Sequence, residues 1–357
     1  MTSEERTPTL ALNGPEPPST KPARSMKDRF FEAAPPSAFF LDANDPQGVA
    51  AFLSRHAWLK PGEKVLSLES AGQGNMNYLL RVTTDARTFI LKQSRPWVEK
   101  YPEIAAPFDR ALVEAEFYRL VAGTEAASFL PKLYGFDEES RILCLEDLGN
   151  AGDCCDLYAG ASLTPNERHQ LYRFLSLLHS SRARLANRAM RALNHFHIFV
   201  FPFQANNGID LDRFTMGLQN LADRLKTSHF LLHRVSELGR IYLADGDYLV
   251  HGDLFPGSWL RSPSGIKVID PEFAFAGARE FDVGVLLAHE RIAGLAPYPS
   301  LLQSHYAQWN EIDSQLVSGF AGVEILRRLL GVAQLPLSFD LERKQALLES
   351  AVALVLG

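Results

Sequence analysis

The pattern of apolar and polar positions divides the chain into a β-rich part and a helical part. Between residues 65 and 93, three short apolar stretches alternate with polar turns, which predicts three strands, VLSLES, YLLRVTT and TFILKQS. A charged helix is expected over residues 107–122, and two more strands joined by an acidic turn are expected over 130–149. Residues 60–148 therefore predict a mostly antiparallel sheet with one inserted helix.

The remainder of the chain carries helical apolar spacing, with one interruption. The spacing recurs over 164–182, 211–244 and most of 298–356. The segment 247–275, DYLVHGDLFPGSWLRSPSGIKVIDPEFAF, instead contains two short apolar strands, Tyr248–Val250 and Ile266–Ile269, which we expect to form a hairpin. This is an α+β plan with a small antiparallel-sheet lobe followed by a larger, mostly helical lobe.

The N-terminal region differs from both parts. Residues 1–26 are rich in Pro, Thr and Ser without apolar periodicity, so we expect a disordered tail. A helix is predicted near residues 45–58, with Asp45 as its cap and Pro46 in its first turn. The predicted organisation is a tail (1–26), an N-lobe (27–148) and a helical C-lobe (149–357) that holds the hairpin.

Composition and charge narrow the function classes. The 357 residues include 36 Lys and Arg against 42 Asp and Glu, a net charge of −6, which argues against a nucleic-acid or membrane-surface binder. The three cysteines cannot form a disulfide framework, and no run of about 18 apolar residues occurs. A cytoplasmic protein without a membrane span is expected.

A glycine turn joins the first two strands and is the first candidate for chemistry. It reads GQGNMN over Gly72–Asn77, and glycines there would let backbone N–H groups approach a phosphate closely. An ordinary hairpin turn would also use glycine. The candidate nucleotide contacts in this turn are Gly72, Gly74, Asn75 and Asn77.

Lys92 closes the third strand just downstream of that turn. On the inner face of the sheet it could pair with phosphate oxygens, provided that an acidic partner keeps it charged and oriented. Glu114 and Glu116 on the next helix are both available; Glu116 is taken as the candidate, and the choice between them stays open. The alternative is a solvated lysine on the sheet surface.

Three acids flank the two short strands of the C-lobe. Asp253 follows YLV, so a carboxylate is presented just past a strand end, where it could take a proton from an acceptor hydroxyl. Asp270 ends the next strand, and Glu272, two residues on, can share its face and a Mg²⁺ ion. The alternative is three exposed loop acids, but the apolar strands on both sides argue against full exposure.

Together these parts match the needs of phosphoryl transfer. That reaction requires a phosphate-cradling loop, a lysine, a metal-binding acid and a base near the hydroxyl. The chain supplies all four in the order used by kinases. We therefore predict an ATP- and Mg²⁺-dependent kinase.

The same segments resemble a known superfamily. VHGDLFPGSWL followed by VIDPEFAF is similar to the aminoglycoside phosphotransferases and choline kinases, relatives of protein kinases. The loop GQGNMNYLLRV, the segment LKQSRPWVEKYP, the acidic pair written DPE and the C-terminal GFAGVEILRRLLGVAQL look closest to the S-methyl-5-thioribose kinase branch. The resemblance spans about residues 60–350 and implies a two-lobed protein-kinase-like fold.

The resemblance also implies roles for individual residues. Asp253 would be the catalytic base, Asp270 and Glu272 the magnesium ligands, and Lys92 the ligand of the ATP phosphates. The linker Glu146–Leu148 would meet the adenine through its backbone, with Glu146 and Leu148 as candidate contacts. Arg327 and Arg328 would lie near the sugar or the transferred phosphate, together with Asp253. Adjacent arginines point about 100° apart on a helix, so at most one is expected to reach a given pocket; an ion pair at a lobe surface is the alternative.

The implied partner is a small, sugar-like hydroxyl acceptor. The histidine common after HGDL in this family is Phe255 here, so other acceptors stay open: an aminoglycoside, choline, an amino alcohol or another pentose. A catalytically silent nucleotide-binding scaffold is the alternative from a different class. A homodimer is kept open as the assembly. His179 is expected to be a helix packing residue.

Overall fold

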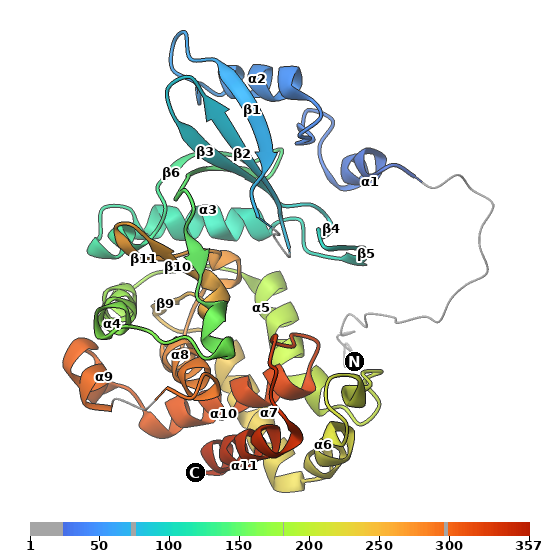
Figure 1. Cartoon of the computed structure of the whole chain (residues 1–357), viewed down its shortest axis with the longest axis vertical. Coiled ribbons are helices and arrows are strands. Elements are labelled where there is room, and N and C mark those ends of the chain that lie inside the picture. The colour runs from blue at the N-terminus through green and yellow to red at the C-terminus, as the bar shows by residue number, and fades with distance from the viewer. Residues whose placement is uncertain (1–23, 73–75, 181, 296–298) are drawn as a thin grey trace, which may run out of the picture.

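The computed structural model describes residues 24–72, 76–180, 182–295 and 299–357. The chain forms two stacked lobes, a sheet lobe and a larger helical lobe (Figure 1). The sheet of the N-lobe is antiparallel, with the strand order β1 (Val65–Ser70), β2 (Tyr78–Thr84), β3 (Thr88–Gln93), β7 (Ile142–Glu146) and β6 (Leu133–Asp137). The strands expected over residues 65–93 are thus confirmed.

Helices cover both faces of this sheet because β7 is apolar on both sides. Ile142 and Cys144 join a core with α2 (Pro46–Arg55), whose cap is Asp45, as predicted. Leu143 and Leu145 join a second core with α3 (Arg110–Val121). Successive strand residues point to opposite faces, so one strand anchors a helix on each side.

Two features of the N-lobe were not predicted. A short hairpin of β4 (Trp97–Val98) and β5 (Tyr101–Ala105) separates β3 from α3. The helix α1 (Met26–Ala33) begins inside the expected tail, because Ser25 and Asp28 form a capping box at its start. Residues 1–23 of that tail lie outside the described residues.

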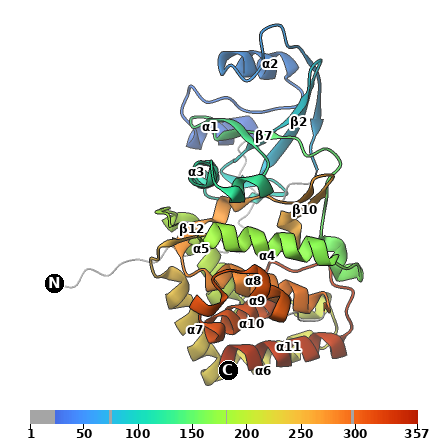
Figure 2. The ribbon, with the colours of Figure 1, turned by 90° about the vertical axis from the view of Figure 1, so that its left-hand side faces the viewer.

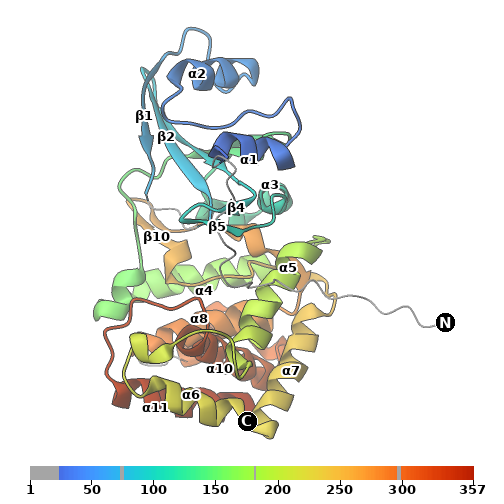
Figure 3. The same ribbon diagram turned by 90° about the vertical axis from the view of Figure 1, so that its right-hand side faces the viewer.

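The C-lobe contains helices that stack below the sheet, as Figures 2 and 3 show. They are α4 (Pro165–His179), α5 (Arg188–His195), α6 (Leu218–Lys226), α7 (His229–Leu243), α8 (Glu280–Ile292), α9 (Pro299–His305), α10 (Ser314–Leu330) and α11 (Leu341–Leu356). The long α10 packs against both α8 and α11, and its apolar side chains lie in the core of this lobe. This packing brings residues of α8 and α10 together beside the loop that follows β9 and carries Asp253. No helix in the described ranges is both long and apolar enough to cross a bilayer.

The prediction that the two short strands of the C-lobe form a hairpin with each other is wrong. The strand β9 (Tyr248–Val250) pairs with β12 (Phe275–Gly277), whereas β11 (Gly265–Val268) pairs with β10 (Trp259–Ser262), and β10 also pairs with β8 (Gly152–Asp153). A 3₁₀ turn at Pro256–Ser258 carries the chain from β9 into this separate sheet. The Ile269 N–H donates to the Ser258 carbonyl (3.0 Å), which keeps the loops that carry Asp253 and Asp270 adjacent.

Candidate active site

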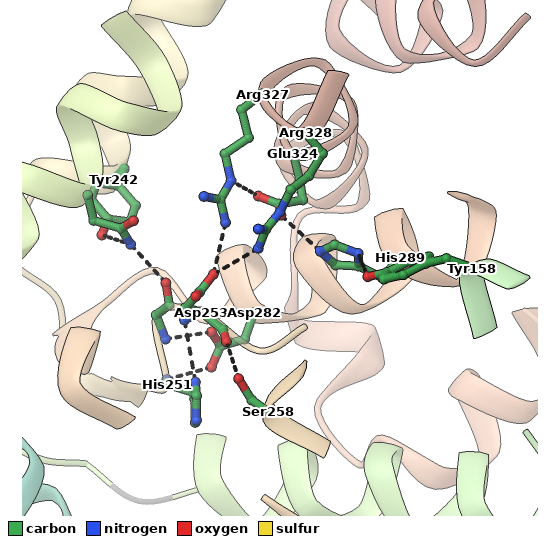
Figure 4. Close-up of polar contacts among 12 residues, drawn as sticks. Tyr158, Tyr242, His251, Asp253, Ser258, Asp282, His289, Glu324, Arg327 and Arg328 are labelled. Atoms are coloured by element: carbon green, nitrogen blue, oxygen red, sulfur yellow. Dashed lines mark hydrogen bonds and ion pairs between the residues drawn. The ribbon is translucent and has the colours of Figure 1, made fainter. Parts of the chain in front are cut away.

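The loop after β9 is fixed by buried hydrogen bonds from behind. Asp282, fully buried on α8, accepts from the backbone N–H of His251 (2.7 Å) and of Gly252 (3.0 Å). Asn194 of α5 donates to the Gly252 carbonyl (2.9 Å), and His251 Nε2 donates to the Ile269 carbonyl (3.0 Å). The backbone of this loop is therefore held from several sides, and the side chain of Asp253 is presented in front of it (Figure 4).

His179 takes part in this support. Its side chain is buried, and Nε2 donates to Asp282 Oδ2 (3.3 Å) while Nδ1 contacts the Tyr306 hydroxyl (2.8 Å). It is thus a buried packing residue, as expected, but one that also orients the Asp282 carboxylate beneath the loop that carries Asp253.

Both arginines of α10 reach Asp253. Arg327 Nη2 lies 2.9 Å and Arg328 Nη2 lies 3.2 Å from the same atom, Asp253 Oδ1. The expectation that at most one would face the pocket is wrong, because arginine side chains are long enough to converge from diverging Cα positions. Both are also gathered by Glu324, one turn earlier on the helix, as Figure 4 shows.

Lys92 lies between two carboxylates contributed by different lobes. Its Nζ is 2.7 Å from Glu114 Oε2 and 2.5 Å from Asp270 Oδ1. Burial alone would lower the pKa of Lys92, but the Asp270, Glu114 and Glu272 carboxylates outweigh it and hold that pKa above its ordinary value. The lysine is therefore charged and oriented toward the lobe boundary.

The choice of Glu116 as a site residue is corrected by this arrangement. Its side chain is 41% exposed and pairs with Arg119 (3.4 Å). Glu114 points inward instead, and burial together with Asp270 and Glu272 raises its pKa despite the opposing effect of Lys92. The two glutamates are two positions apart on a helix, so they face nearly opposite sides.

Asp270 and Glu272 occupy different environments. Asp270 has a half-exposed side chain and a left-handed backbone (φ 62°, ψ 50°), a region that Asp tolerates better than most residues and that often marks functional sites. Glu272 is buried, and its Oε2 accepts from Asn77 Nδ2 (2.8 Å) and lies 3.4 Å from Arg110 Nε. Both contacts use Oε2, so Oε1 is the oxygen that could bind a cation.

The donor set suits magnesium only with further ligands. Within the described ranges no group of three or more His, Cys, Asp or Glu side chains could hold a metal. Mg²⁺ is commonly bound by one or two carboxylates plus substrate phosphates and waters. The Asp270 and Glu272 carboxylates fit that pattern, and the remaining ligands would come with the nucleotide.

The glycine turn is only partly described. Gly74 and Asn75 lie outside the described residues, whereas Gly72 has a left-handed backbone (φ 76°) that favours glycine. The Asn77 side chain points into the protein: Nδ2 donates to Glu272, and Oδ1 accepts from Arg110 Nε (2.9 Å) and Ser94 Oγ (3.0 Å). Both polar atoms of the Asn77 side chain thus already have partners. A contact between Asn77 and a nucleotide stays a prediction, and it would use the backbone.

The linker between the lobes is held by a residue that sequence reasoning missed. Arg81 on β2 forms a two-point ion pair with Asp147 (2.8 and 3.0 Å) and donates to the Gly149 carbonyl (2.9 Å). Glu146 accepts from the Lys132 N–H (3.1 Å). The side chains of Glu146 and Asp147 are thus held by neighbouring strands, and the adenine contacts of Glu146 and Leu148 stay a prediction.

Comparison with known proteins shows the family of the chain. The model of the phosphotransferase enzyme family APH matches residues 67–313, well over half of the chain. The chain belongs to this phosphotransferase family. It is 27% identical, over 82% of its length and 89% of the relative's, to the methylthioribose kinase of Exiguobacterium sibiricum.

Solved structures agree on the fold of this phosphotransferase. A choline kinase from Streptococcus pneumoniae superposes with a TM-score of 0.51 at 16% identity, covering 87% of this chain and 99% of that one. A spectinomycin phosphotransferase in complex with ADP and its substrate gives 0.52 at 14% identity, covering 87% and 97%. The two-lobed protein-kinase-like fold predicted from sequence is confirmed. At these identities the likeness establishes the fold alone.

Further supporting residues were missed by sequence reasoning. Asp282 and Asn194 carry no local signal, because only packing brings them to the loop that carries Asp253. Glu324 had one: it stands three and four positions before the two arginines, a spacing that puts all three on one side of the helix.

Proposed function

We propose that this phosphotransferase uses ATP and Mg²⁺ to phosphorylate a hydroxyl of a neutral or anionic, sugar-like acceptor related to methylthioribose. The observation that carries the proposal is the pair Arg327 and Arg328 on Asp253. Two guanidinium groups beside the catalytic carboxylate disfavour a cationic acceptor, such as an aminoglycoside or choline, by like-charge repulsion. The similarity to methylthioribose kinases supports the same substrate class.

The residues would divide the chemistry as follows. Asp253 would accept a hydrogen bond from the acceptor hydroxyl and take its proton as the new oxygen–phosphorus bond forms. The bond between the γ-phosphorus and the β–γ bridging oxygen breaks, and that oxygen leaves with ADP. Lys92 would hold ATP phosphate oxygens, and the arginines would offer N–H donors to the phosphoryl oxygens. Magnesium, on Asp270 and Glu272, would neutralise phosphate charge.

An ATP-consumption screen tests the proposal. ADP release is measured with methylthioribose, other pentoses, aminoglycosides, choline and amino alcohols. We expect turnover with methylthioribose or a related sugar and none with the cationic compounds. Turnover confined to cationic acceptors would contradict the proposal, and nucleotide binding without turnover over the whole panel would favour a silent scaffold.

Two variants test the assigned roles within that screen. Asp253→Asn and Asp270→Asn should each abolish turnover and leave the fold intact. Asparagine also tolerates the left-handed backbone of position 270, so strain does not confound the second variant. Near-normal turnover in either variant would overturn its assignment. A cytoplasmic location and a homodimer belong to the same proposal, and sedimentation of the purified protein tests the second.

A further inference from the structure

A carboxylate behind the arginine pair binds both of its members. Arg328 Nε donates to Glu324 Oε1 (2.7 Å), and Arg327 Nε donates to Glu324 Oε2. Residues three and four positions apart lie on the same side of a helix, so one carboxylate can hold two adjacent arginines, one on each oxygen. The Nε atoms point back to Glu324 while the Nη2 atoms point forward to Asp253 (Figure 4).

A second element fixes Glu324 in turn. His289 Nε2 on α8 lies 2.9 Å from Glu324 Oε1, and His289 Nδ1 lies 2.7 Å from the Tyr158 hydroxyl. All three side chains are at least 97% buried. Water therefore does not compete for these hydrogen bonds. A continuous series of hydrogen bonds runs from Tyr158 through His289, Glu324 and the arginines to Asp253.

The direction of each hydrogen bond follows from its partners. An ionised carboxylate only accepts, so His289 donates to Glu324 from Nε2. A neutral imidazole then has an acceptor at Nδ1, to which the Tyr158 hydroxyl donates. Burial, opposed by Glu324, lowers the pKa of His289 to about 4, so the ring is neutral at physiological pH. In this arrangement the hydrogen bond from Tyr158 to His289 and the one from His289 to Glu324 each have one donor and one acceptor.

The charges of the cluster also balance. Arg327 and Arg328 face Glu324 on one side and Asp253 on the other, two positive groups against two negative ones. Without Glu324, Asp253 would be the only carboxylate among these partners, and both guanidinium groups could close on it. They would then compete with the acceptor hydroxyl for the oxygens that must take the proton.

Phe255 confines one of the arginines further. Its ring lies 4.5 Å from the Arg328 guanidinium carbon and 5.8 Å from the His289 ring. A guanidinium on an aromatic face is held by dispersion and by the ring quadrupole. The residue that departs from the family pattern thus packs against the same cluster.

We propose that Glu324, held in place by His289 and Tyr158, is a positioning residue that directs Arg327 and Arg328 onto Asp253 and keeps that carboxylate available to the acceptor. This inference rests on the proposed function. It assigns to Tyr158, His289 and Glu324 a role in turnover, although none of them is placed to touch the reacting atoms.

The test is the variant Glu324→Gln, measured with the acceptor that the wild type uses. The amide keeps the shape of the side chain but offers one acceptor oxygen, and its NH₂ group faces an arginine donor. We expect kcat to fall about 100-fold, as misplacement of reacting groups commonly causes. The KM for ATP should stay within about threefold of wild type, because the proposed nucleotide contacts of the glycine turn, Lys92 and the linker are left unchanged.

A matched control separates this role from general stability. Glu290 on α8 is equally buried and binds Arg168 (2.8 Å from each oxygen) and the Tyr172 hydroxyl, away from Asp253. Glu290→Gln makes the same chemical change to a buried ion pair. We expect it to lower the urea midpoint while kcat per folded molecule stays near wild type.

A second variant keeps the inference falsifiable if Glu324→Gln does not fold. Tyr158→Phe removes only the hydroxyl at the far end of the chain, so we expect a smaller fall in kcat and an unchanged KM for ATP. Wild-type kcat in a folded Glu324→Gln, or in Tyr158→Phe when the first variant is unfolded, overturns the inference alone. Absence of turnover in the wild type with every acceptor overturns the proposed function, and the inference with it.

Discussion

Lys92 and Asp270 meet across the lobe boundary, with Nζ and Oδ1 2.5 Å apart although 178 residues separate them in the chain. Lys92 comes from β3 of the sheet lobe, and Asp270 follows β11 of the helical lobe. Glu114 on α3 completes the contact from behind the lysine. The lysine proposed to bind the nucleotide and the proposed metal ligand are therefore brought together by the arrangement of the two lobes.

Replacing Lys92 by methionine should abolish most activity. The change removes the donors proposed for the ATP phosphates and leaves Glu114 with an uncompensated buried charge. We expect kcat to fall at least about 100-fold, in the range seen when one charge-stabilising donor is lost. Steady-state kinetics on protein shown to be folded by circular dichroism measures it.

Lys267→Met is the control for this variant. Lys267 lies on β11, three residues before Asp270, and donates to the backbone carbonyl of Ser128 (2.7 Å). It should keep wild-type kcat. Equal losses of kcat in Lys92→Met and Lys267→Met would show that removing either lysine acts through stability and not through contacts with the ATP phosphates.

Gly252 is required for two physical reasons. Its backbone is left-handed (φ 86°), and a Cβ there would lie 2.2 Å from the Phe273 carbonyl oxygen. Its own backbone N–H and that of His251 also donate to Asp282. Gly252→Ala must therefore displace either the loop that carries Asp253 or the loop after Asp270, and we expect loss of turnover together with a lower urea midpoint.

Gly160→Ala isolates the contribution of backbone strain. Gly160 is also left-handed (φ 99°), but nothing lies within 4 Å of its added Cβ. Strain alone costs roughly 1–2 kcal/mol. We expect Gly252→Ala to be clearly worse than this control in unfolding by urea, and equal losses would contradict the close-contact argument.

Local patterns predicted the strands of the sheet well because short apolar stretches are bounded by polar turns. The stretches VLSLES and YLLRVTT coincide with β1 (Val65–Ser70) and β2 (Tyr78–Thr84), and TFILKQS extends one residue beyond β3 (Thr88–Gln93). The pairing of β9 with β12 could not be predicted, since it joins segments some 25 residues apart and depends on where the 3₁₀ turn sends the chain. Adjacency in sequence suggested a hairpin that tertiary packing does not form.

The residues of the candidate site likewise fall into those that a local pattern predicts and those that only tertiary packing brings together. Asp253, Asp270 and Lys92 stand at strand ends, so the sequence marked them, and the structure brings Lys92 and Asp270 together. The inward face of α3 depends on how that helix packs, so Glu114 and Glu116 could not be separated by spacing. Asp282 belongs to the site only through the packing of α8.

Asn77 links the glycine turn to the proposed metal ligand. Asn77→Ala would remove the donor to Glu272 Oε2 and the acceptor of Ser94 Oγ and Arg110 Nε in a buried place, and would leave the 3.4 Å contact between Arg110 Nε and Glu272 Oε2. Unsatisfied buried groups cost about 1–3 kcal/mol, so we expect a loss of that size in the free energy of unfolding. Without Asn77 the Glu272 carboxylate is less firmly oriented. We therefore expect a higher magnesium concentration to be needed for half-maximal turnover.

Asn44→Ala serves as the control for that measurement. Its side chain is exposed and bonds only to Asp42 two residues away. We expect almost no change in unfolding free energy or in magnesium dependence. A magnesium dependence in Asn77→Ala equal to that of wild type would show that Asn77 does not orient Glu272.

His289 should make the fold sensitive to mild acid. Its pKa is lowered to about 4 by burial and by the Arg328 and Arg327 charges, against the opposing effect of Glu324, while Tyr158 contacts its other nitrogen. The unfolded chain binds a proton at this histidine near pH 6.5. Between those values the unfolded state holds more protons than the folded one, so stability falls as the pH drops from 6.5 to 4.

The measurement is the free energy of unfolding by urea at pH 7 and pH 4 for wild type and His289→Gln. The full difference in pKa corresponds to about 3 kcal/mol, so wild type should lose up to that much more than the variant over this range. Glutamine has no proton to gain, so this part of the pH dependence disappears with the ring. His233→Gln, an exposed histidine in contact with water in both states, should keep the wild-type dependence. Parallel pH curves for wild type and His289→Gln would show that the ring takes up its proton at the same pH in the folded protein as in the unfolded chain, and the hydrogen-bond directions assigned from Tyr158 to Glu324 would then be wrong.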